Sequence, residues 1–238
     1  MAPPGSHRRI PEATVTRLPV YQRILHELVR AGTTTVSSEQ LADLAHVNAS
    51  KVRKDLSFLG SFGTRGSGYD TAFLAGQMDR ELGLGGDWPV VVIGLGNLGT
   101  ALANSPGFTS RGFRVAGLFD VDPALVGQTL RGVVVRHVTE LKEATAGDPP
   151  AIGVITAPAS VAQEVADRLV EAGAGSILNF APRVLRVPPT VLLRYVDLSM
   201  ELQVMSFFLS HRENDGAGTV PGTALLQAVG VTSVDQPA

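Results

Sequence analysis

The chain has 238 residues, of which 44% are hydrophobic and 18% charged, a composition typical of a folded protein with two domains of ordinary size. Its formal net charge of −2 divides unevenly, because residues 1–85 hold 10 Lys and Arg against 8 Asp and Glu, whereas the rest hold 10 against 14. No apolar run approaches the roughly 18 residues that cross a bilayer. Cysteine is absent, which excludes disulfides, thiolate metal sites and thiol-based redox sensing.

The N-terminal residues show no secretory signal, since Arg8, Arg9 and Arg17 are not followed by an apolar segment. We therefore expect a cytoplasmic protein. Residues 1–17 are rich in Pro and Arg and lack a helical or strand period, so we expect a flexible arm there.

Three helices are predicted after the arm. Apolar residues recur at helical spacing from Tyr21 to Ala31, and Gly32 ends the run. Ser37-Ser38-Glu39-Gln40 offers a capping box for a short second helix. A turn at 46–48 with Asn48 as a cap then leads into a third helix over 50–59. Two short helices joined in this way predict a helix-turn-helix.

The third helix is expected to present positive charge to solvent. Val52, Leu56 and Leu59 share one stripe at helical spacing, so the cations between them project away from the core. Cations on the outer face of the second helix of a helix-turn-helix suit the major groove of DNA. The alternative is a solvated charged face without a ligand. The predicted DNA contacts on this helix are Lys51, Arg53, Lys54 and Ser57.

Gly60–Tyr69 alternates glycine with small and aromatic residues, which predicts a hairpin wing. Thr64 and Arg65 lie at its tip, where an arginine can enter a minor groove. With a closing helix at Thr71–Leu82, a winged helix DNA-binding domain is expected over residues 18–82. The glycine-rich segment 83–87 is the expected hinge.

Strands and helices alternate beyond the hinge, over residues 88–197. This alternation predicts an α/β fold with a doubly wound parallel sheet. The predicted strands are Val90–Ile93, Val115–Phe119, Val133–His137, Ile152–Thr156 and Ser176–Asn179. The predicted helices are Leu98–Asn104, Thr139–Ala146 and Ser160–Ala172. The tail from 213 to 238 is expected to be disordered.

A glycine fingerprint follows the first of these strands directly and precedes a helix. In Gly94-Leu95-Gly96-Asn97-Leu98-Gly99, the first glycine makes the tight turn, the second admits a pyrophosphate and the third allows close helix packing. Asp120 ends the second strand about 20 residues later, where its carboxylate can bind ribose hydroxyls and repel a 2′-phosphate. The pattern predicts a Rossmann domain that binds NAD(H). The alternative is an ordinary strand-to-helix turn with a solvated acid.

Two later loops at strand ends are expected to complete the cofactor site, because ligands of open α/β sheets bind outside the carboxyl ends of the strands. The predicted cofactor residues are Gly94, Leu95, Gly96, Asn97, Leu98, Gly99, Asp120, Thr156, Ala157, Pro158, Asn179 and Phe180.

The chain has a helix-turn-helix, a glycine-rich wing, a hinge and a dinucleotide-binding fold in this order. It closely resembles the Rex family of bacterial redox-sensing repressors, over about four-fifths of its length. The segments that carry the resemblance are Arg17-Leu18-Pro19, Val36-Ser37-Ser38, Val52-Arg53-Lys54-Asp55-Leu56-Ser57, Gly66-Ser67-Gly68-Tyr69, the glycine fingerprint, Phe119-Asp120-Val121-Asp122-Pro123, Ile177-Leu178-Asn179-Phe180-Ala181-Pro182 and Val196-Asp197-Leu198.

The resemblance implies a repressor that binds palindromic operator DNA with NAD⁺ or without reduced cofactor, and that NADH releases. It also implies a homodimer in which a C-terminal dimerisation helix at 198–212 swaps onto the partner. Phe207 and Phe208 belong to an apolar face of this helix, and this face is too large to remain exposed to solvent. A cross-protomer ion pair between Arg23 and Asp197 is a further hypothesis. The chain departs from the family at Ser105, where members often carry a tyrosine close to the nicotinamide.

An enzyme is the main alternative, namely a small NAD- or CoA-binding oxidoreductase or ligase-like protein on the same sheet. A dehydrogenase needs an acid or base near the hydride, and between Asp122 and Asn179 only His137 and Lys142 are candidates, in no recognisable motif. A structural NAD-binding subunit would leave the helix-turn-helix unexplained. The five histidines are isolated along the sequence, so we expect no metal site and no catalytic residues.

Overall fold

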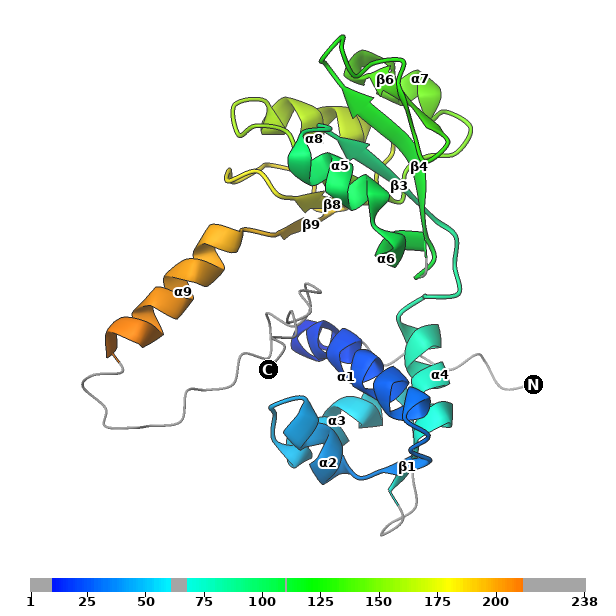
Figure 1. Cartoon of the computed structure of the whole chain (residues 1–238), viewed down its shortest axis with the longest axis vertical. Coiled ribbons are helices and arrows are strands. Elements are labelled where there is room, and N and C mark those ends of the chain that lie inside the picture. Colours follow the sequence, from blue (N-terminus) through cyan, green and yellow to red (C-terminus); the bar gives the residue numbers. More distant parts are fainter. Residues whose placement is uncertain (1–9, 61–67, 110, 212–238) are drawn as a thin grey trace, which may run out of the picture. The chain divides into compact units, whose positions relative to one another are not determined.

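The computed structural model describes residues 10–60, 68–109 and 111–211 (Figure 1). The described residues up to Leu84 form one compact unit, and Gly85 to Ser210 form a second. Within the described part of the chain, no helix combines the length and the hydrophobicity that a membrane crossing requires.

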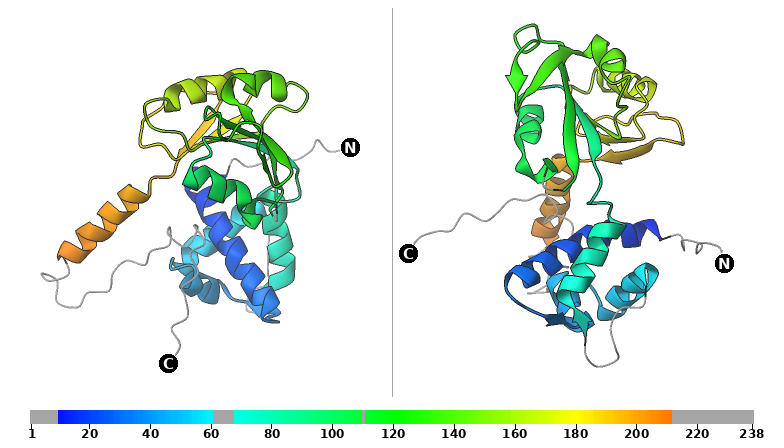
Figure 2. Two further views of the ribbon diagram at one scale, coloured as in Figure 1. Left: turned by 45° about the horizontal axis from the view of Figure 1, so that its top comes forward. Right: turned by 90° about the vertical axis from the view of Figure 1, so that its right-hand side faces the viewer.

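The N-terminal unit is a small helical domain. Its elements are α1 (Glu12–Arg30), β1 (Thr35–Val36), α2 (Ser38–Leu44), α3 (Ala49–Leu59), β2 (Tyr69–Asp70) and α4 (Thr71–Glu81). Helices α1 and α4 lie side by side (Figure 2). Their apolar residues, with those of α2 and α3, form one core whose fully buried members include Leu18, Tyr21, Leu25, Leu41, Val52, Leu74 and Met78.

Helix α1 begins at Glu12, so the prediction of a flexible arm up to residue 17 was wrong for residues 12–17. The physical reason is a contact between distant segments. Thr14 is only 3% exposed, and it and Arg17 both bond to Asp55 of α3, about 40 residues along the chain. A helical period in the local sequence could not show this partner.

The helix-turn-helix forms as predicted. Ser37 accepts a hydrogen bond of 3.1 Å from the Gln40 backbone, and the Gln40 side chain accepts one of 2.8 Å from the Ser37 backbone, which completes the capping box. Asn48 caps α3 by accepting a hydrogen bond from the Ser50 backbone. Strands β1 and β2 pair in antiparallel fashion, with Val36 opposite Tyr69. Most of the predicted wing, including Thr64 and Arg65, lies outside the described residues.

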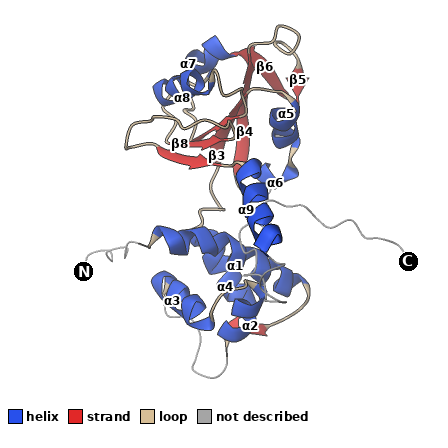
Figure 3. Cartoon of the chain, turned by 90° about the vertical axis from the view of Figure 1, so that its left-hand side faces the viewer, coloured by secondary structure: helices blue, strands red, loops and turns tan. Residues whose placement is uncertain are grey.

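The second unit is a seven-stranded sheet with helices on both faces (Figure 3). The strands lie in the order β5-β6-β4-β3-β7-β8-β9. Their bounds are β3 (Trp88–Ile93), β4 (Phe113–Asp120), β5 (Thr129–Leu130), β6 (Val133–His137), β7 (Ile152–Ile155), β8 (Ser176–Asn179) and β9 (Leu192–Tyr195). Without β5, this is the 3-2-1-4-5-6 order of the doubly wound dinucleotide-binding fold.

The predicted all-parallel sheet is wrong at one edge, where β5 pairs with β6 in antiparallel fashion. Arg131 and Gly132, the two residues between these strands, both have positive φ (50° and 81°), which fits a tight two-residue hairpin turn. Strand β9 was also missed. It is a short edge strand with mostly exposed residues, so it lacks the apolar run that marks a buried parallel strand.

Alternate residues of β3 point to opposite faces of the sheet. Val90 and Val92 face the core under α5 (Asn97–Asn104), whereas Val91 and Ile93 face the core under α8 (Ala162–Glu171). The remaining helical elements of the second unit are α6 (Pro106–Thr109), a 3₁₀ turn at Val138–Glu140 and α7 (Leu141–Ala144). The two apolar cores, one on each face of the sheet, hold the central strands and so position their carboxyl ends.

The last described element, α9 (Leu198–His211), has no buried residue. Its large apolar side chains are between 37% and 64% exposed. They are Leu198, Met200, Leu202, Val204, Met205, Phe207, Phe208 and Leu209.

Candidate nucleotide pocket and nucleic-acid interface

A pocket of about 500 Å³ lies at the carboxyl ends of the central strands of the second unit. It adjoins the point between β3 and β7 where the strand order reverses, which is where open α/β sheets bind ligands. Its lining is mainly apolar. The ionisable side chains that line it are Asp120, Glu164 and Arg168, and the last two form an ion pair of 2.9 Å.

Two glycines of the fingerprint are required by close backbone contacts. Gly94 has φ of +96°, and a Cβ there would lie 2.8 Å from the backbone nitrogen of Ala157. A Cβ on Gly99 would overlap the carbonyl oxygen of Gly94, so α5 can only approach the turn this closely without a side chain. Both positions therefore shape the loop, as the sequence predicted.

Gly96 differs from these two glycines, because a Cβ there would meet nothing within 4 Å. It precedes α5 as its N-cap residue, without a side chain that caps the free N–H groups of the first turn. Uncapped N–H groups at a helix N-terminus beside open space suit the negative charge of a pyrophosphate. The residues present therefore fit a dinucleotide.

Two polar side chains tie the loops of the pocket together. The Thr156 hydroxyl donates to the carbonyl oxygen of Gly94 at 2.6 Å, which links the end of β7 to the glycine turn. Asp120 accepts hydrogen bonds from the backbone N–H groups of Leu95 at 2.5 Å and Val121 at 2.7 Å. The acid is thus fixed at the end of β4, partly exposed to the pocket.

Eight of the predicted cofactor residues line the pocket: Gly94, Gly96, Leu98, Asp120, Thr156, Ala157, Pro158 and Phe180. Four do not, namely Leu95, Asn97, Gly99 and Asn179. Asn179 is 1% exposed, and its carboxamide bonds to the backbone of Ala181 and Arg183, so it shapes the loop after β8.

An apolar wall of four valines was missed. Val121 and Val138 directly follow the strands β4 and β6, so their positions at strand ends could have identified them. Val161 and Val165 come from α8 and its preceding turn. Which face of α8 meets the pocket depends on how the helix packs on the sheet, and the sequence alone does not show this packing.

The predicted DNA-binding residues of α3 share its exposed side. Lys51, Arg53, Lys54 and Ser57 are exposed, whereas Val52 is buried. This matches the predicted division between an inner apolar stripe and an outer cationic face. Ser57 bonds to the Lys54 carbonyl oxygen at 2.7 Å.

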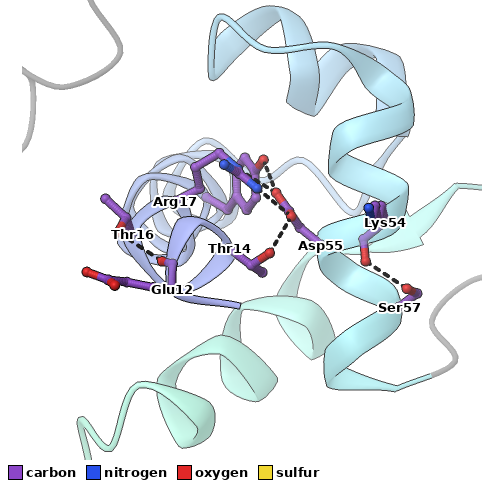
Figure 4. A network of polar contacts seen from close by, with 8 residues as sticks. Glu12, Thr14, Thr16, Arg17, Lys54, Asp55 and Ser57 are labelled. Carbon is purple, nitrogen blue, oxygen red and sulfur yellow. Dashed lines mark hydrogen bonds and ion pairs between the residues drawn. The ribbon is translucent and has the colours of Figure 1, made fainter. Parts of the chain in front are cut away.

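Asp55 lies on the inner side of α3, 1% exposed, and sequence reasoning gave it no role (Figure 4). Arg17 donates to both of its carboxylate oxygens at 2.7 Å. The hydroxyls of Thr14 and Tyr21 donate at 2.9 Å each. Four hydrogen bonds thus join α3 to the first turns of α1.

The protonation state of Asp55 follows from this network. Burial alone would raise the pKa of its carboxyl group, but the hydrogen bonds from Arg17 and Thr14 outweigh burial and lower it. Burial, and then the bond to Asp55, raises the pKa of the Tyr21 hydroxyl. At neutral pH Asp55 is therefore an ionised carboxylate, which accepts hydrogen bonds from the protonated Tyr21 hydroxyl and the Arg17 guanidinium.

The residues of the hypothesised switch lie in both units. Arg23 is on α1, and Asp197 directly precedes α9, where it accepts a hydrogen bond from the Ser199 backbone at 2.9 Å. Hydrogen bonds from Ser199 lower the pKa of the Asp197 carboxyl group.

Phe207 and Phe208 of α9 contact each other edge to face, with ring centroids 5.6 Å apart. The hydroxyl of Ser105 accepts a hydrogen bond from the Gly107 backbone.

No cluster of three or more metal-binding side chains occurs among the described residues.

Two family models match the chain. One, described as "CoA binding domain", matches residues 86–183, and the other, described as "Putative DNA-binding protein N-terminus", matches residues 9–57.

Relatives match the chain almost from end to end. A protein from Streptomyces avermitilis named redox-sensing transcriptional repressor Rex is 54% identical, over 93% of this chain and 89% of its own. A crystal structure of RSP in complex with β-NAD⁺ and operator DNA is 38% identical, with a TM-score of 0.82 over 86% of this chain and 94% of that one. RSP in complex with β-NADH is 37% identical, with a TM-score of 0.80 over 87% and 97%.

Proposed function

Because this chain belongs to the Rex family of redox-sensing transcriptional repressors, we propose that it represses transcription by binding operator DNA and that NADH releases it. NAD⁺, or the absence of reduced cofactor, leaves it bound. The observation that carries the proposal is the presence of a cationic recognition helix and a dinucleotide pocket in one chain that matches RSP with both ligands.

On the DNA side, α3 is proposed to enter the major groove with Arg53 and Lys54 at its contact surface. The helix-turn-helix supplies the geometry, and the exposed cations supply the attraction to phosphates and base edges. Lys51 and Ser57 extend this surface, and Thr64 and Arg65 of the wing are proposed to contact the adjacent minor groove.

On the cofactor side, the N-terminus of α5 and Gly96 are proposed to hold the pyrophosphate, and Asp120 the adenosine ribose. The valine wall is proposed to accept the adenine ring, because its apolar side chains line the same pocket as Asp120. A bound nicotinamide can be oxidised or reduced, and only its reduced form is proposed to release DNA. A carboxylate at the ribose favours NAD(H) over its 2′-phosphorylated form.

The protein is proposed to act without catalysis, as a cytoplasmic DNA-binding protein. Hydride transfer to a substrate needs an acid or base such as Lys, His or Tyr, and none lines the described pocket. Its ionisable residues have other contacts, since Glu164 pairs with Arg168 and Asp120 accepts backbone hydrogen bonds.

We propose a homodimer in which α9 packs on the partner, because so large an apolar helix surface is otherwise in water. Phe207→Glu is the test, with mass measured by light scattering. The expected result is a dimer for the wild type and a monomer for the variant. A wild-type chain that is monomeric at micromolar concentration would contradict the dimer.

The repressor function is tested by fluorescence anisotropy of the full chain. The wild type is used to select a palindromic duplex at fixed salt, and the complex is then titrated with NAD⁺ or NADH. Retention in NAD⁺ and release in NADH is the expected result. Binding that ignores both nucleotides would refute redox sensing, and absence of any selected duplex would favour an enzyme.

A further inference from the structure

The guanidinium of Arg53 is held by side chains from two helices. Its Nη1 donates to the Glu39 carboxylate and to the Ser38 hydroxyl, both at 2.8 Å, and both residues are in the first turn of α2. Its Nη2 lies 3.4 Å from the Ser50 hydroxyl on α3. The exposed face of α3 therefore carries one side chain that is held in place.

The donors of this guanidinium divide into two groups. An arginine has five N–H donors, and these contacts use both hydrogens of Nη1 and one of Nη2. The Nε hydrogen and one Nη2 hydrogen have no partner among the described residues. Two donors are the number that a bidentate contact with a guanine edge uses.

The two lysines of the same face differ from Arg53. No side-chain hydrogen bond or ion pair joins Lys51 or Lys54 to another described residue, and each ammonium is a compact charge on a flexible stem. Flexible charges suit phosphates, which carry no sequence information, whereas a fixed planar group suits a base edge.

We propose that Glu39, with Ser38, positions the Arg53 guanidinium for sequence-specific reading of operator DNA, an inference that rests on the proposed function.

The charge of Glu39 supports this role. Hydrogen bonds from its own backbone N–H and from Arg53 hold the pKa of its carboxyl group below the usual value, so it is ionised at neutral pH. A lone carboxylate beside the DNA-binding face would repel phosphates and weaken binding. Paired with Arg53, it costs little repulsion and restricts the rotamers of a long side chain before DNA arrives.

The experiment compares full-length variants on two duplexes at fixed salt, the operator selected by the wild type and a scrambled duplex of equal length. Glu39→Ala is expected to lower operator affinity about tenfold and to leave scrambled-duplex affinity within about twofold. Glu39→Gln keeps an oxygen acceptor and is expected to lose less. In an Arg53→Ala background, Glu39→Ala is expected to have no further effect on the operator.

Asp43→Ala is the matched control, since Asp43 is an exposed acid on the same helix and makes no side-chain bond to Arg53. It removes the same charge and is expected to change the affinity for both duplexes by the same small factor. NADH affinity of each variant, measured separately, confirms that the second unit is intact.

Two outcomes would overturn the inference while the proposed function stands. If Glu39→Ala binds the operator more tightly than the wild type, the carboxylate competes with DNA for Arg53. If Glu39→Ala weakens both duplexes equally, its role is only structural. A wild-type chain that fails to prefer its operator, or that NADH does not release, would instead refute the proposed function, without any variant.

Discussion

The two units form their sites in opposite ways. In the second unit the glycine side of the pocket is shaped by backbone at strand ends, where Gly94 allows a close backbone contact, Gly96 leaves open space and Thr156 ties two loops together. In the N-terminal unit the proposed DNA interface consists mainly of side chains on the exposed face of α3. Their positions depend on contacts from beneath and beside that helix, through Asp55 and Glu39.

This difference determines how each site fails. A site made of backbone is lost when a side chain fills its space, even if the fold remains stable. A site made of side chains is lost when its support is removed, even if every contact residue is still present. Substitutions that remove support and substitutions that fill space therefore separate these two kinds of failure.

The largest effect is expected from Asp55→Ala. It leaves the Arg17 guanidinium and the Tyr21 hydroxyl without their acceptor, and breaking a buried ion pair costs about 3–5 kcal/mol of unfolding free energy. Urea unfolding followed by circular dichroism should show early loss of helix. Trp88, the only tryptophan, reports on the second unit and should unfold at the wild-type urea concentration. Simultaneous unfolding of both signals would contradict independent support.

The next effect is on DNA binding. Arg53→Ala combined with Lys54→Ala removes two cations from α3 and should lower operator affinity about 100-fold, since the base contact proposed for Arg53 is worth about 1–3 kcal/mol and Lys54 adds attraction to phosphates. Anisotropy measures this loss. NADH affinity should stay at the wild-type value, because both residues lie in the N-terminal unit. An enzyme or a structural NAD-binding subunit would retain its function in this variant.

A smaller effect is expected from Gly96→Ala, which adds a methyl group to the open space before α5. NADH affinity should fall about tenfold, because a pyrophosphate must approach this backbone closely. Operator binding without NADH should be unchanged, and release should need correspondingly more NADH. Gly147→Ala, which also adds its Cβ in open space, is the control and should behave as the wild type. Equal NADH affinity in both variants would place the pyrophosphate elsewhere.

The smallest effect is the pH dependence of the N-terminal unit. The pKa of Asp55 is lower in the folded chain than its ordinary value, so its contribution to stability is complete above the unfolded pKa of about 4 and is lost as pH falls through the folded pKa. Each pKa unit is worth only about 1.4 kcal/mol. Urea unfolding of the wild type between pH 5 and pH 2 should therefore lose more stability than Asp55→Asn, and parallel curves would contradict the assignment.

The pocket could largely be predicted from the sequence because its determinants are local. A strand, three glycines at fixed spacing, a helix and an acid about 20 residues later occur in chain order, and each element has one structural reason. The edge hairpin at β5 and the contribution of α8 were missed. Both depend on tertiary packing or on a two-residue turn that the periodicity of the strands does not reveal.

The interface could be predicted only in part. The spacing of Val52 and Leu56 identifies the outer face of α3, so its cations were found. The contacts that organise this face join residues far apart in sequence, from Thr14 to Asp55 and from Glu39 to Arg53. Such pairs leave no periodic signal, and the first turns of α1 were assigned to a flexible arm for the same reason.

We propose that the two sites act on one equilibrium, so that NADH and operator DNA oppose each other. The most direct measurement is operator affinity with and without saturating NADH, together with NADH affinity with and without saturating operator, by anisotropy and calorimetry at one salt concentration. Linkage requires the same factor in both directions, and we predict that each ligand weakens the other equally, by at least about tenfold. Affinities that are unchanged by the other ligand would show that the two sites are independent, contrary to this prediction.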